Sequence, residues 1–308
     1  MRVAAIDLGT NTTRLLVADV DDGRVDEVVR RTAITRLGEG VDERRRLLPL
    51  PIARVRNVLS DYRREAESLG AERALLVATS AVRDAENGEA FLGEIEWSYG
   101  FTTRELTGDE EARLTLRGIA TGRALDRATL VVDIGGGSTE LVLGDERASL
   151  DIGAVRLTER FLASDPPTSR ELDACAAAAR EALPPLAPSG AVGVAGTITT
   201  VAALDLGLDA YDREKVHGRR IPRAGVESVL ERLAALPLAQ RREVPALEPE
   251  RAAVIVGGVV ILREILDRYG LDEIEASERD ILDGAALDAA ALPEPAEGDA
   301  PPGAYTCC

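Results

Sequence analysis

Apolar side chains in the first half of the chain recur with the period of a helix in some stretches and form short strand-like runs in others. Amphipathic or helix-forming stretches cover residues 51–69, 87–99 and 107–120. Short runs rich in apolar and β-branched side chains lie before and between them, at residues 3–6, 15–17, 25–34, 74–80 and 102–106. The predicted order is three strands, helix, strand, helix, strand, helix. This order is typical of an α/β fold.

The second half follows a similar plan. Residues 130–155 predict another run of strands joined by tight turns, and a strand and turn are expected at 191–197. A short strand is expected at 273–276. The predicted helices of this half are residues 168–183, 226–235, 250–269 and 280–291. Residues 293–308 are rich in Pro, Gly and Ala, and we expect them to be disordered.

One short phrase occurs twice, at residues 7–17 and 133–143, with an offset of 126 residues. Each copy follows an apolar run, begins with Asp, continues with Gly and small polar residues, and leads into a second apolar run. A repeat of this kind indicates two related domains. We therefore predict domains at residues 1–120 and 121–292, joined by a hinge near residues 117–128.

The residues around the two turns argue against two common phosphate-binding motifs. A Walker phosphate loop needs a nearby Lys, and the single lysine, Lys215, is far from both turns in sequence. A dinucleotide fingerprint needs a following helix, whereas residues 138–143 predict a strand. Each unit is therefore expected to be a hairpin whose turn offers backbone N–H groups to phosphate. A purely structural hairpin is the alternative, but three successive glycines at Gly135 to Gly137 weigh against it.

The charge and composition of the chain disfavour some classes of binding partner. The formal net charge is −17, which disfavours nucleic acid and also opposes a polyanionic substrate. No stretch is long and apolar enough to span a membrane and no signal peptide is evident, so we expect a cytoplasmic protein. Three arginine clusters could offset the acidic field locally, although most of these arginines are expected to be ordinary solvated side chains: Arg30-Arg31, Arg44-Arg45-Arg46 and Arg63-Arg64.

Several segments carry a family resemblance. The two turns resemble the phosphate loops of the actin-like ATPase superfamily. Asp133 to Glu140 is identical to the Asp-Ile-Gly-Gly-Gly-Ser-Thr-Glu motif of the exopolyphosphatase and guanosine pentaphosphate phosphohydrolase (Ppx/GppA) family, and other segments are similar to further motifs of that family. These segments lie at residues 37–40, 78–85, 107–114, 152–157 and 196–199. The chain thus resembles a short, two-domain member.

This resemblance implies two actin-like (ribonuclease H-like) α/β domains with a cleft between them, and hydrolysis of a terminal phosphoanhydride. Residues 110 and 111 are both Glu. Glu111 matches the family residue that activates water, whereas Glu110 is expected to be structural. Asp133 and Glu140 match carboxylates linked to catalysis and metal, and Asp7 is a second metal candidate. The expected metal is Mg²⁺ or Mn²⁺, because hard cations prefer oxygen ligands. The residues expected to bind phosphate are Asn11, Thr12, Arg83, Gly135, Gly136, Gly137, Ser138 and Thr139.

Three functions remain open at this point. The first is a Mg²⁺-dependent exopolyphosphatase that releases orthophosphate from inorganic polyphosphate. The second is hydrolysis of guanosine pentaphosphate, and the third is a nucleotide-binding regulatory clamp, for which Gly257-Gly258 resembles an adenosine contact. The family resemblance also implies a homodimer. Two departures from the family pattern are Arg14, and Leu282-Asp283 where Arg-Glu is usual.

Overall fold

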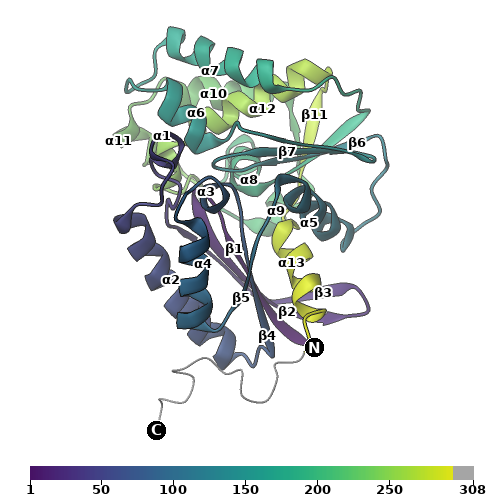
Figure 1. Ribbon diagram of the computed structural model, residues 1–308. Coiled ribbons are helices and arrows are strands. Elements are labelled where there is room, and N and C mark those ends of the chain that lie inside the picture. Colours follow the sequence, from purple (N-terminus) through teal and green to yellow (C-terminus); the bar gives the residue numbers. More distant parts are fainter. Residues whose placement is uncertain (294–308) are drawn as a thin grey trace. The chain divides into compact units, whose positions relative to one another are not determined.

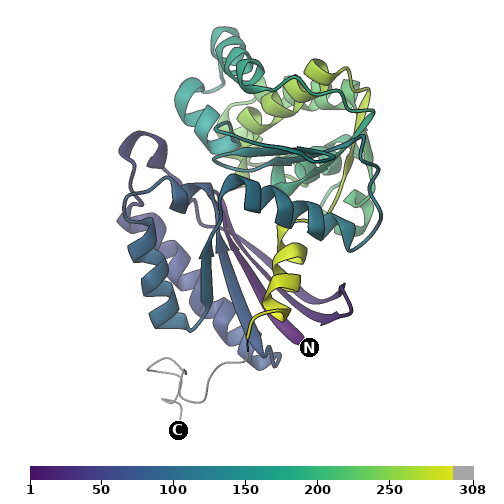
Figure 2. The same ribbon diagram turned by 45° about the vertical axis from the view of Figure 1, so that its right-hand side comes forward.

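The computed structural model describes residues 1–293, and its internal contacts divide the chain into two units. Unit 1 comprises residues 1–123 and the segment that begins at Ile281, and unit 2 comprises residues 124–280. Each unit is a sheet with helices (Figures 1 and 2). No helix within residues 1–293 is long and apolar enough to cross a membrane.

The sheet of unit 1 begins as an antiparallel meander and continues with parallel strands. Its spatial order is β3-β2-β1-β4-β5. β1 pairs antiparallel with β2 and parallel with β4. The strands are β1 (Arg2–Leu8), β2 (Thr12–Asp21), β3 (Arg24–Ile34), β4 (Arg73–Ala78) and β5 (Thr102–Glu105).

Both faces of this sheet are covered, and β1 is buried on both sides. Ala4, Ile6 and Leu8 belong to one apolar cluster, whereas Val3 and Ala5 belong to another, as the two-residue period of a strand requires. α2 (Pro49–Ser68) and α4 (Gly88–Tyr99) supply the first cluster. α5 (Gly108–Ala120) and α13 (Ile281–Ala290) supply the second. The short helices are α1 (Val41–Arg44) and α3 (Ser80–Arg83).

The sheet of unit 2 has the order β10-β11-β9-β6-β7-β8. α12 packs against α6, α7 and α10, and α7 and α12 run beside one another in Figure 1. The strands are β6 (Thr129–Ile134), β7 (Thr139–Leu143), β8 (Glu146–Leu150), β9 (Gly190–Val194), β10 (Arg220–Pro222) and β11 (Glu273–Ala276). The helices are α6 (Ala154–Phe161), α7 (Ser169–Ala182), α8 (Ala195–Asp205), α9 (Arg213–Val216), α10 (Arg223–Ala234), α11 (Leu238–Arg241), the 3-10 helix η1 (Arg251–Ala253) and α12 (Ile255–Tyr269).

The repeat in the sequence is also a repeat in the fold. Reading β8-β7-β6-β9-β11 against β3-β2-β1-β4-β5 gives the same succession of antiparallel and parallel neighbours. This is the ribonuclease H-like arrangement of actin-like domains, so the predicted α/β class is confirmed. Two local predictions were wrong: residues 195–197 begin a helix, and residues 154–155 belong to α6.

The expected domain limits need one correction. We expected residues 121–292 to form the second domain, but α13 packs on α5 and β1 and therefore belongs to unit 1. Gly284 permits this packing because a Cβ there would lie 2.1 Å from the backbone oxygen of Leu114. The expectation of a disordered tail at residues 293–308 falls, from residue 294 onward, outside the described residues.

We predict that Gly284→Ala destabilises unit 1, because the new methyl group would overlap backbone of α5 that cannot rotate away. Overpacking of this kind costs about 1–3 kcal/mol. Gly93→Ala is the matched control, since Gly93 lies in α4 with no atom within 4 Å of its Cβ position. The control should be stabilising by about 0.5–1 kcal/mol. Urea unfolding measures both, and equal stabilities for the two variants would contradict this packing.

Candidate functional site

The two repeated turns are built by the same hydrogen bond. In unit 1 the Gly9 N–H donates to the Thr12 carbonyl at 2.9 Å. In unit 2 the Gly135 N–H donates to the Ser138 carbonyl at 3.0 Å. These residues correspond at the 126-residue offset. The sequence repeat therefore reproduces the turn geometry, not only the residue types.

Helix α6 holds the carbonyl groups of the second turn. The N–H groups of Ala154 and Val155 donate to the carbonyls of Gly135 and Gly136 at 2.9 and 2.8 Å. The buried Arg156 side chain donates from Nε to the Gly137 carbonyl at 2.7 Å. Three successive carbonyls of the turn therefore face α6.

This orientation decides where the turn's N–H groups point. In a planar trans peptide the N–H lies opposite the preceding C=O. The N–H groups of Gly136, Gly137 and Ser138 are thus directed away from α6. Successive N–H groups on one side of a turn form a concave anion-binding nest, which suits phosphate oxygens. The geometry supports Gly135 to Ser138 as a phosphate loop.

The first turn is held from behind by the segment that follows β3. The Thr10 carbonyl accepts from the Gly38 N–H at 2.8 Å, and the Asn11 carbonyl accepts from Thr35 and Arg36 N–H groups at 3.1 and 2.9 Å. The same peptide geometry directs the N–H groups of Asn11 and Thr12 away from that segment. Gly38 is required for this approach, because its Cβ would lie 2.2 Å from the Thr10 methyl.

Asn11 also has a side chain suited to a ligand. It is only 7% exposed, and its amide nitrogen and oxygen make no hydrogen bond to any part of the chain that the structure describes. A buried polar group without a partner costs about 1–3 kcal/mol. A bound phosphate oxygen would satisfy the amide N–H. This is the most direct structural support for Asn11 as a phosphate ligand.

The repeats differ in charge at one register position. On β1 and β2, Asp7 lies directly opposite Arg14, whose Nε and Nη2 donate to Asp7 Oδ2 at 2.9 and 2.7 Å. On β6 and β7 the equivalent pair is Asp133 and Glu140, both buried. Directly opposite Cβ atoms are about 5 Å apart, so two carboxylates share one face in unit 2. The first site is an ion pair and the second concentrates negative charge.

The donor chemistry therefore fits a hard cation better in unit 2 than in unit 1. Asp133 and Glu140 offer carboxylate oxygens, and Glu140 Oε1 is held by the Ser149 hydroxyl at 2.8 Å. The Oδ2 atom of Asp7 accepts two guanidinium N–H groups, whereas its buried Oδ1 makes no hydrogen bond within the described residues, so Asp7 offers at most one oxygen to a cation. Within residues 1–293, no group of three or more His, Cys, Asp or Glu side chains gathers in a metal-binding arrangement. Further ligands would have to come from water and substrate, as is usual for Mg²⁺.

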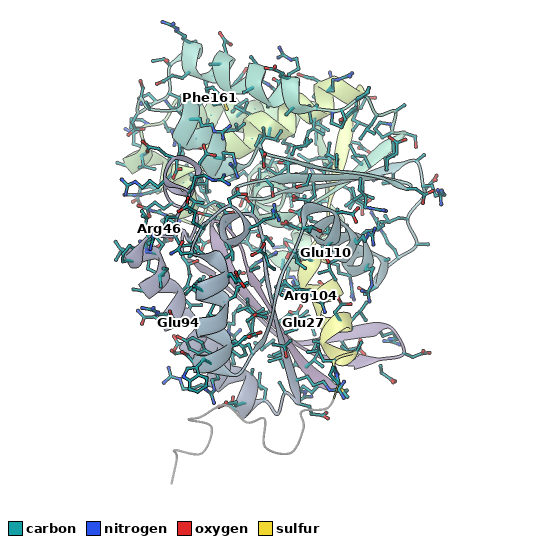
Figure 3. All side chains as sticks on the ribbon, in the orientation of Figure 1. Glu27, Arg46, Glu94, Arg104, Glu110 and Phe161 are labelled. Atoms are coloured by element: carbon teal, nitrogen blue, oxygen red, sulfur yellow. The ribbon has the colours of Figure 1, made fainter. Side chains whose placement is uncertain are left out.

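Adjacent glutamates on α5 have different roles. Glu110, at the first turn of α5 in Figure 3, forms a capping box with Thr107: its Oε2 accepts from the Thr107 N–H and hydroxyl at 2.8 and 2.7 Å. These bonds lower the pKa of Glu110. Glu111 is buried, and its Oε2 accepts from Arg83 Nη1 at 3.3 Å. The structure thus brings together two residues, Glu111 and Arg83, that the sequence predicted separately.

Arg83 is itself fixed in place. Its Nη1 also donates to the Leu106 carbonyl at 2.7 Å, immediately before the Thr107 cap of α5. The guanidinium therefore ties the end of α3 to the start of α5 and lies against Glu111.

One predicted contact is not supported. The Thr139 side chain is fully buried, and its hydroxyl donates to the Ile152 carbonyl at 2.7 Å. The hydroxyl therefore ties β7 to the segment before α6 and is not directed at a ligand. Sequence reasoning missed the supporting role of Arg156, although it lies in a recognised motif, because nothing in the sequence shows which carbonyl it reaches.

The glycines suggested as an adenosine contact have a packing role. Gly257 and Gly258 are buried on α12, and a Cβ at either position would lie 2.6 or 2.5 Å from the hydroxyl oxygens of Thr158 and Thr197. Both glycines are explained by close approach of neighbouring helices. His217 is likewise structural: its Nδ1 accepts from the Glu278 N–H at 3.1 Å, and burial lowers its pKa.

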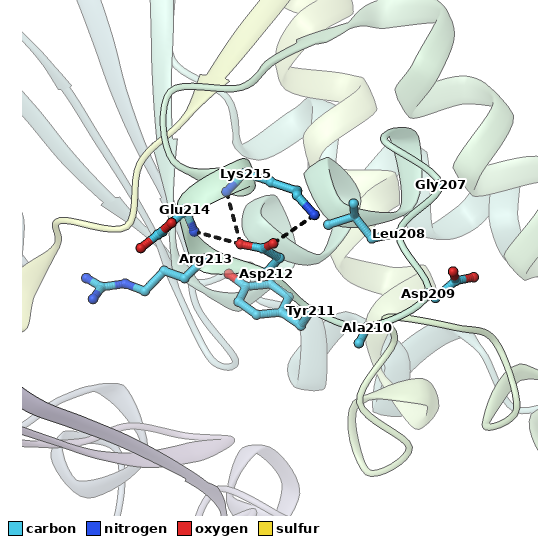
Figure 4. Close-up of a pocket in the computed structure, with 9 residues that line it drawn as sticks. All are labelled: Gly207, Leu208, Asp209, Ala210, Tyr211, Asp212, Arg213, Glu214 and Lys215. Carbon is cyan, nitrogen blue, oxygen red and sulfur yellow. Dashed lines mark hydrogen bonds and ion pairs between the residues drawn. The ribbon is translucent and has the colours of Figure 1, made fainter.

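A separate surface pocket of about 630 Å³ lies in unit 2, lined by residues 207–215 (Figure 4). None of the predicted site residues lines it. Its lysine, Lys215, is paired with Asp212 at 3.0 Å, so that cation is already neutralised. We assign the pocket no role in catalysis.

The fold and the paired turns define an actin-like α/β protein with two units. A family model described as the Ppx/GppA phosphatase family matches residues 16–291, and the chain belongs to that family. Exopolyphosphatase 2 of Mycobacterium tuberculosis is 43% identical, with 93% of this chain and 98% of that protein covered.

Two solved structures are also similar to this chain. The crystal structure of an exopolyphosphatase-like protein is 33% identical with a TM-score of 0.86, covering 94% of this chain and 98% of that one. The Aquifex aeolicus PPX-GPPA enzyme is 32% identical with a TM-score of 0.77, covering 94% and 99%.

We predict that Arg156→Gln weakens anion binding by the second turn, because the Gly137 carbonyl loses the charged donor that Arg156 Nε supplies. The loss of a hydrogen bond from a charged group corresponds to about 1.5–3 kcal/mol. The measurement is the rise in melting temperature produced by orthophosphate, which should shrink markedly in this variant. Arg220→Gln, at an exposed arginine of β10, is the control and should keep the full rise. A full rise in both variants would exclude this role for Arg156.

Proposed function

We propose that this chain is an exopolyphosphatase that hydrolyses the terminal phosphoanhydride of inorganic polyphosphate and releases orthophosphate. The observation that carries the proposal is the pair of turns whose carbonyls are held from behind and whose N–H groups face outward. The similarity to a protein named Exopolyphosphatase 2 supports the choice of substrate.

The phosphate contacts follow from the turns. Backbone N–H groups of Gly136, Gly137 and Ser138 bind oxygens of the terminal phosphate in unit 2. The Asn11 amide and the Thr12 N–H bind phosphate oxygens in unit 1. Phosphoryl transfer depends mainly on positioning and charge neutralisation, and preorganised backbone donors supply both.

Glu111 is the proposed general base. It accepts a proton from the attacking water as the water oxygen bonds to the terminal phosphorus and the bond to the bridging oxygen breaks. The shortened chain leaves with that oxygen. Arg83 holds the Glu111 carboxylate through the 3.3 Å contact and, as a guanidinium, also suits a phosphate oxygen.

The proposed metal is Mg²⁺ or Mn²⁺, held by Asp133 and Glu140. When bound, it supplies neutralisation of the charge that develops on the phosphate oxygens. Two buried carboxylates on neighbouring strands fit this role, because a cation offsets their mutual repulsion.

We also propose a cytoplasmic homodimer, an expectation that rests on the family resemblance. Light scattering would test the oligomer, and a monomer at all concentrations would exclude it.

Glu111→Gln should lower kcat by about 100- to 10,000-fold, the usual contribution of a general base, while polyphosphate binding persists. Glu110→Gln is the matched control: glutamine also completes a capping box, so activity and stability should stay close to those of the unaltered chain. Phosphate release and calorimetric binding of polyphosphate measure the two effects. Full activity in Glu111→Gln would remove Glu111 from the mechanism.

The same assay tests the substrate. Short polyphosphate, long polyphosphate, guanosine pentaphosphate and ATP are compared with Mg²⁺ present. Release from polyphosphate is expected. Release from guanosine pentaphosphate alone would favour the second family activity, and no release from any substrate would overturn the hydrolase proposal.

Asp133→Asn should weaken Mn²⁺ binding by at least about tenfold, whereas Asp7→Asn should weaken it less, because Arg14 already binds one of the two Asp7 oxygens. Electron paramagnetic resonance of free Mn²⁺ measures both affinities without turnover. Equal losses in the two variants would show that Asp7 is a ligand after all.

A further inference from the structure

The three arginine clusters of the sequence differ in whether their side chains pair with acidic residues. Two clusters are neutralised by acidic side chains. Arg30 pairs with Glu27 and Asp283, and Arg31 pairs with Glu65. In the other paired cluster, Arg63 binds Glu67 at 2.7 Å and Arg64 pairs with Asp61.

The third cluster, Arg44, Arg45 and Arg46, is different, and we call it the arginine turn. All three residues are exposed, and their side chains make no hydrogen bond or ion pair with any residue in the described part of the chain. Arg46 is labelled in Figure 3. Asp42 and Glu43 precede the turn on α1, yet neither forms an ion pair with it. In a chain with a net charge of −17, three unpaired cations in succession are available to an anion.

The backbone of the arginine turn is strained and held in place. Arg45 has a φ of 52°, a left-handed conformation that favours Gly or Asn. Its carbonyl accepts from the Glu86 N–H at 2.8 Å, and the next buried residue, Leu47, exchanges two hydrogen bonds with the Asn87 side chain. Such strain costs about 1–3 kcal/mol and is typical of functional segments.

The arginine turn is joined to the first phosphate turn by a short, hydrogen-bonded segment. Arg36 and Gly38 donate to the carbonyls of Asn11 and Thr10, and α1 begins three residues later at Val41. α1 has four residues, which span about 6 Å at 1.5 Å per residue. The arginines therefore follow closely in sequence on the segment that supports the first turn.

We propose that the arginine turn is a binding subsite for the non-reacting part of a polyphosphate chain. In this proposal the two phosphate turns bind the reacting phosphate. Phosphates further along the polyphosphate are flexible and require only nearby cations. This inference rests on the proposed function and adds to it a preference for substrates that extend beyond the reacting end. Guanidinium groups suit phosphate oxygens because each presents several N–H donors in one plane.

The test compares a variant that loses three unpaired arginines with a control that loses two paired arginines. In Arg44→Gln/Arg45→Asn/Arg46→Gln, asparagine at position 45 keeps a residue that tolerates the left-handed conformation. The control is Arg63→Gln/Arg64→Gln, which removes a half-buried and an exposed arginine that are already paired. Phosphate release is measured on tripolyphosphate and on chains of several tens of phosphates, at low and at high salt.

The arginine-turn variant should raise KM for the long chain on the order of tenfold at low salt, with kcat unchanged and with KM for tripolyphosphate unchanged. The difference should shrink at high salt, because exposed charges are screened. The control should alter neither KM. An equal rise for short and long substrates, or the same rise in the control, would overturn the subsite.

Failure of the subsite and failure of the proposed function give different results. If the unaltered chain releases no phosphate from either polyphosphate, the proposed function is wrong. If the unaltered chain is active and the arginine-turn variant matches it on both substrates, only the subsite is wrong. Calorimetric titration of long polyphosphate into Glu111→Gln, with and without the three substitutions, checks binding without turnover.

Discussion

The direction of a few peptide carbonyls determines what both halves of this protein can bind. In each unit the repeated turn is closed by one N–H to C=O hydrogen bond. The carbonyls of the turn then accept hydrogen bonds from a supporting segment. Residues 35–38 provide this support in unit 1, and residues 154–156 provide it in unit 2. Because a trans peptide fixes N–H opposite C=O, the same bonds direct the N–H groups of the turn away from the supporting segment. The sheet order and helix packing serve to place these two supports.

Within this common frame the two units have diverged in charge. A single register position holds Arg14 in one unit and Glu140 in the other, each opposite an Asp. The first pair is neutral as a whole, and the second carries two negative charges. A repeated fold can therefore place different charges at equivalent positions of its two units. The change requires only one side chain in each hairpin.

The sequence allowed the α/β class and the paired turns to be predicted, because these depend on local periodicity and glycine content, whereas the expected contrast between Glu110 and Glu111 came from the family resemblance. Arg83 and Glu111 were both identified, but their contact was not, since it depends on how α3 and α5 pack. The direction of the Thr139 hydroxyl was not foreseen, because a hydroxyl in a motif does not reveal which way it points. The placement of α13 was also missed, because the close approach at Gly284 depends on a carbonyl of a helix distant in sequence. Contacts between segments distant in sequence account for each of these errors.

The position of α13 affects how the protein can fold during synthesis. Unit 2 is an insertion within unit 1, since the chain leaves unit 1 after Arg123 and returns at Ile281. Leu282, Ala285 and Ala289 fill the apolar cluster against Val3 and Ala5 on β1. The first unit to be translated therefore cannot complete its core until the ribosome has also made the whole of the second. Unit 2 can form its own core first, which reverses the usual order of folding from the N-terminus.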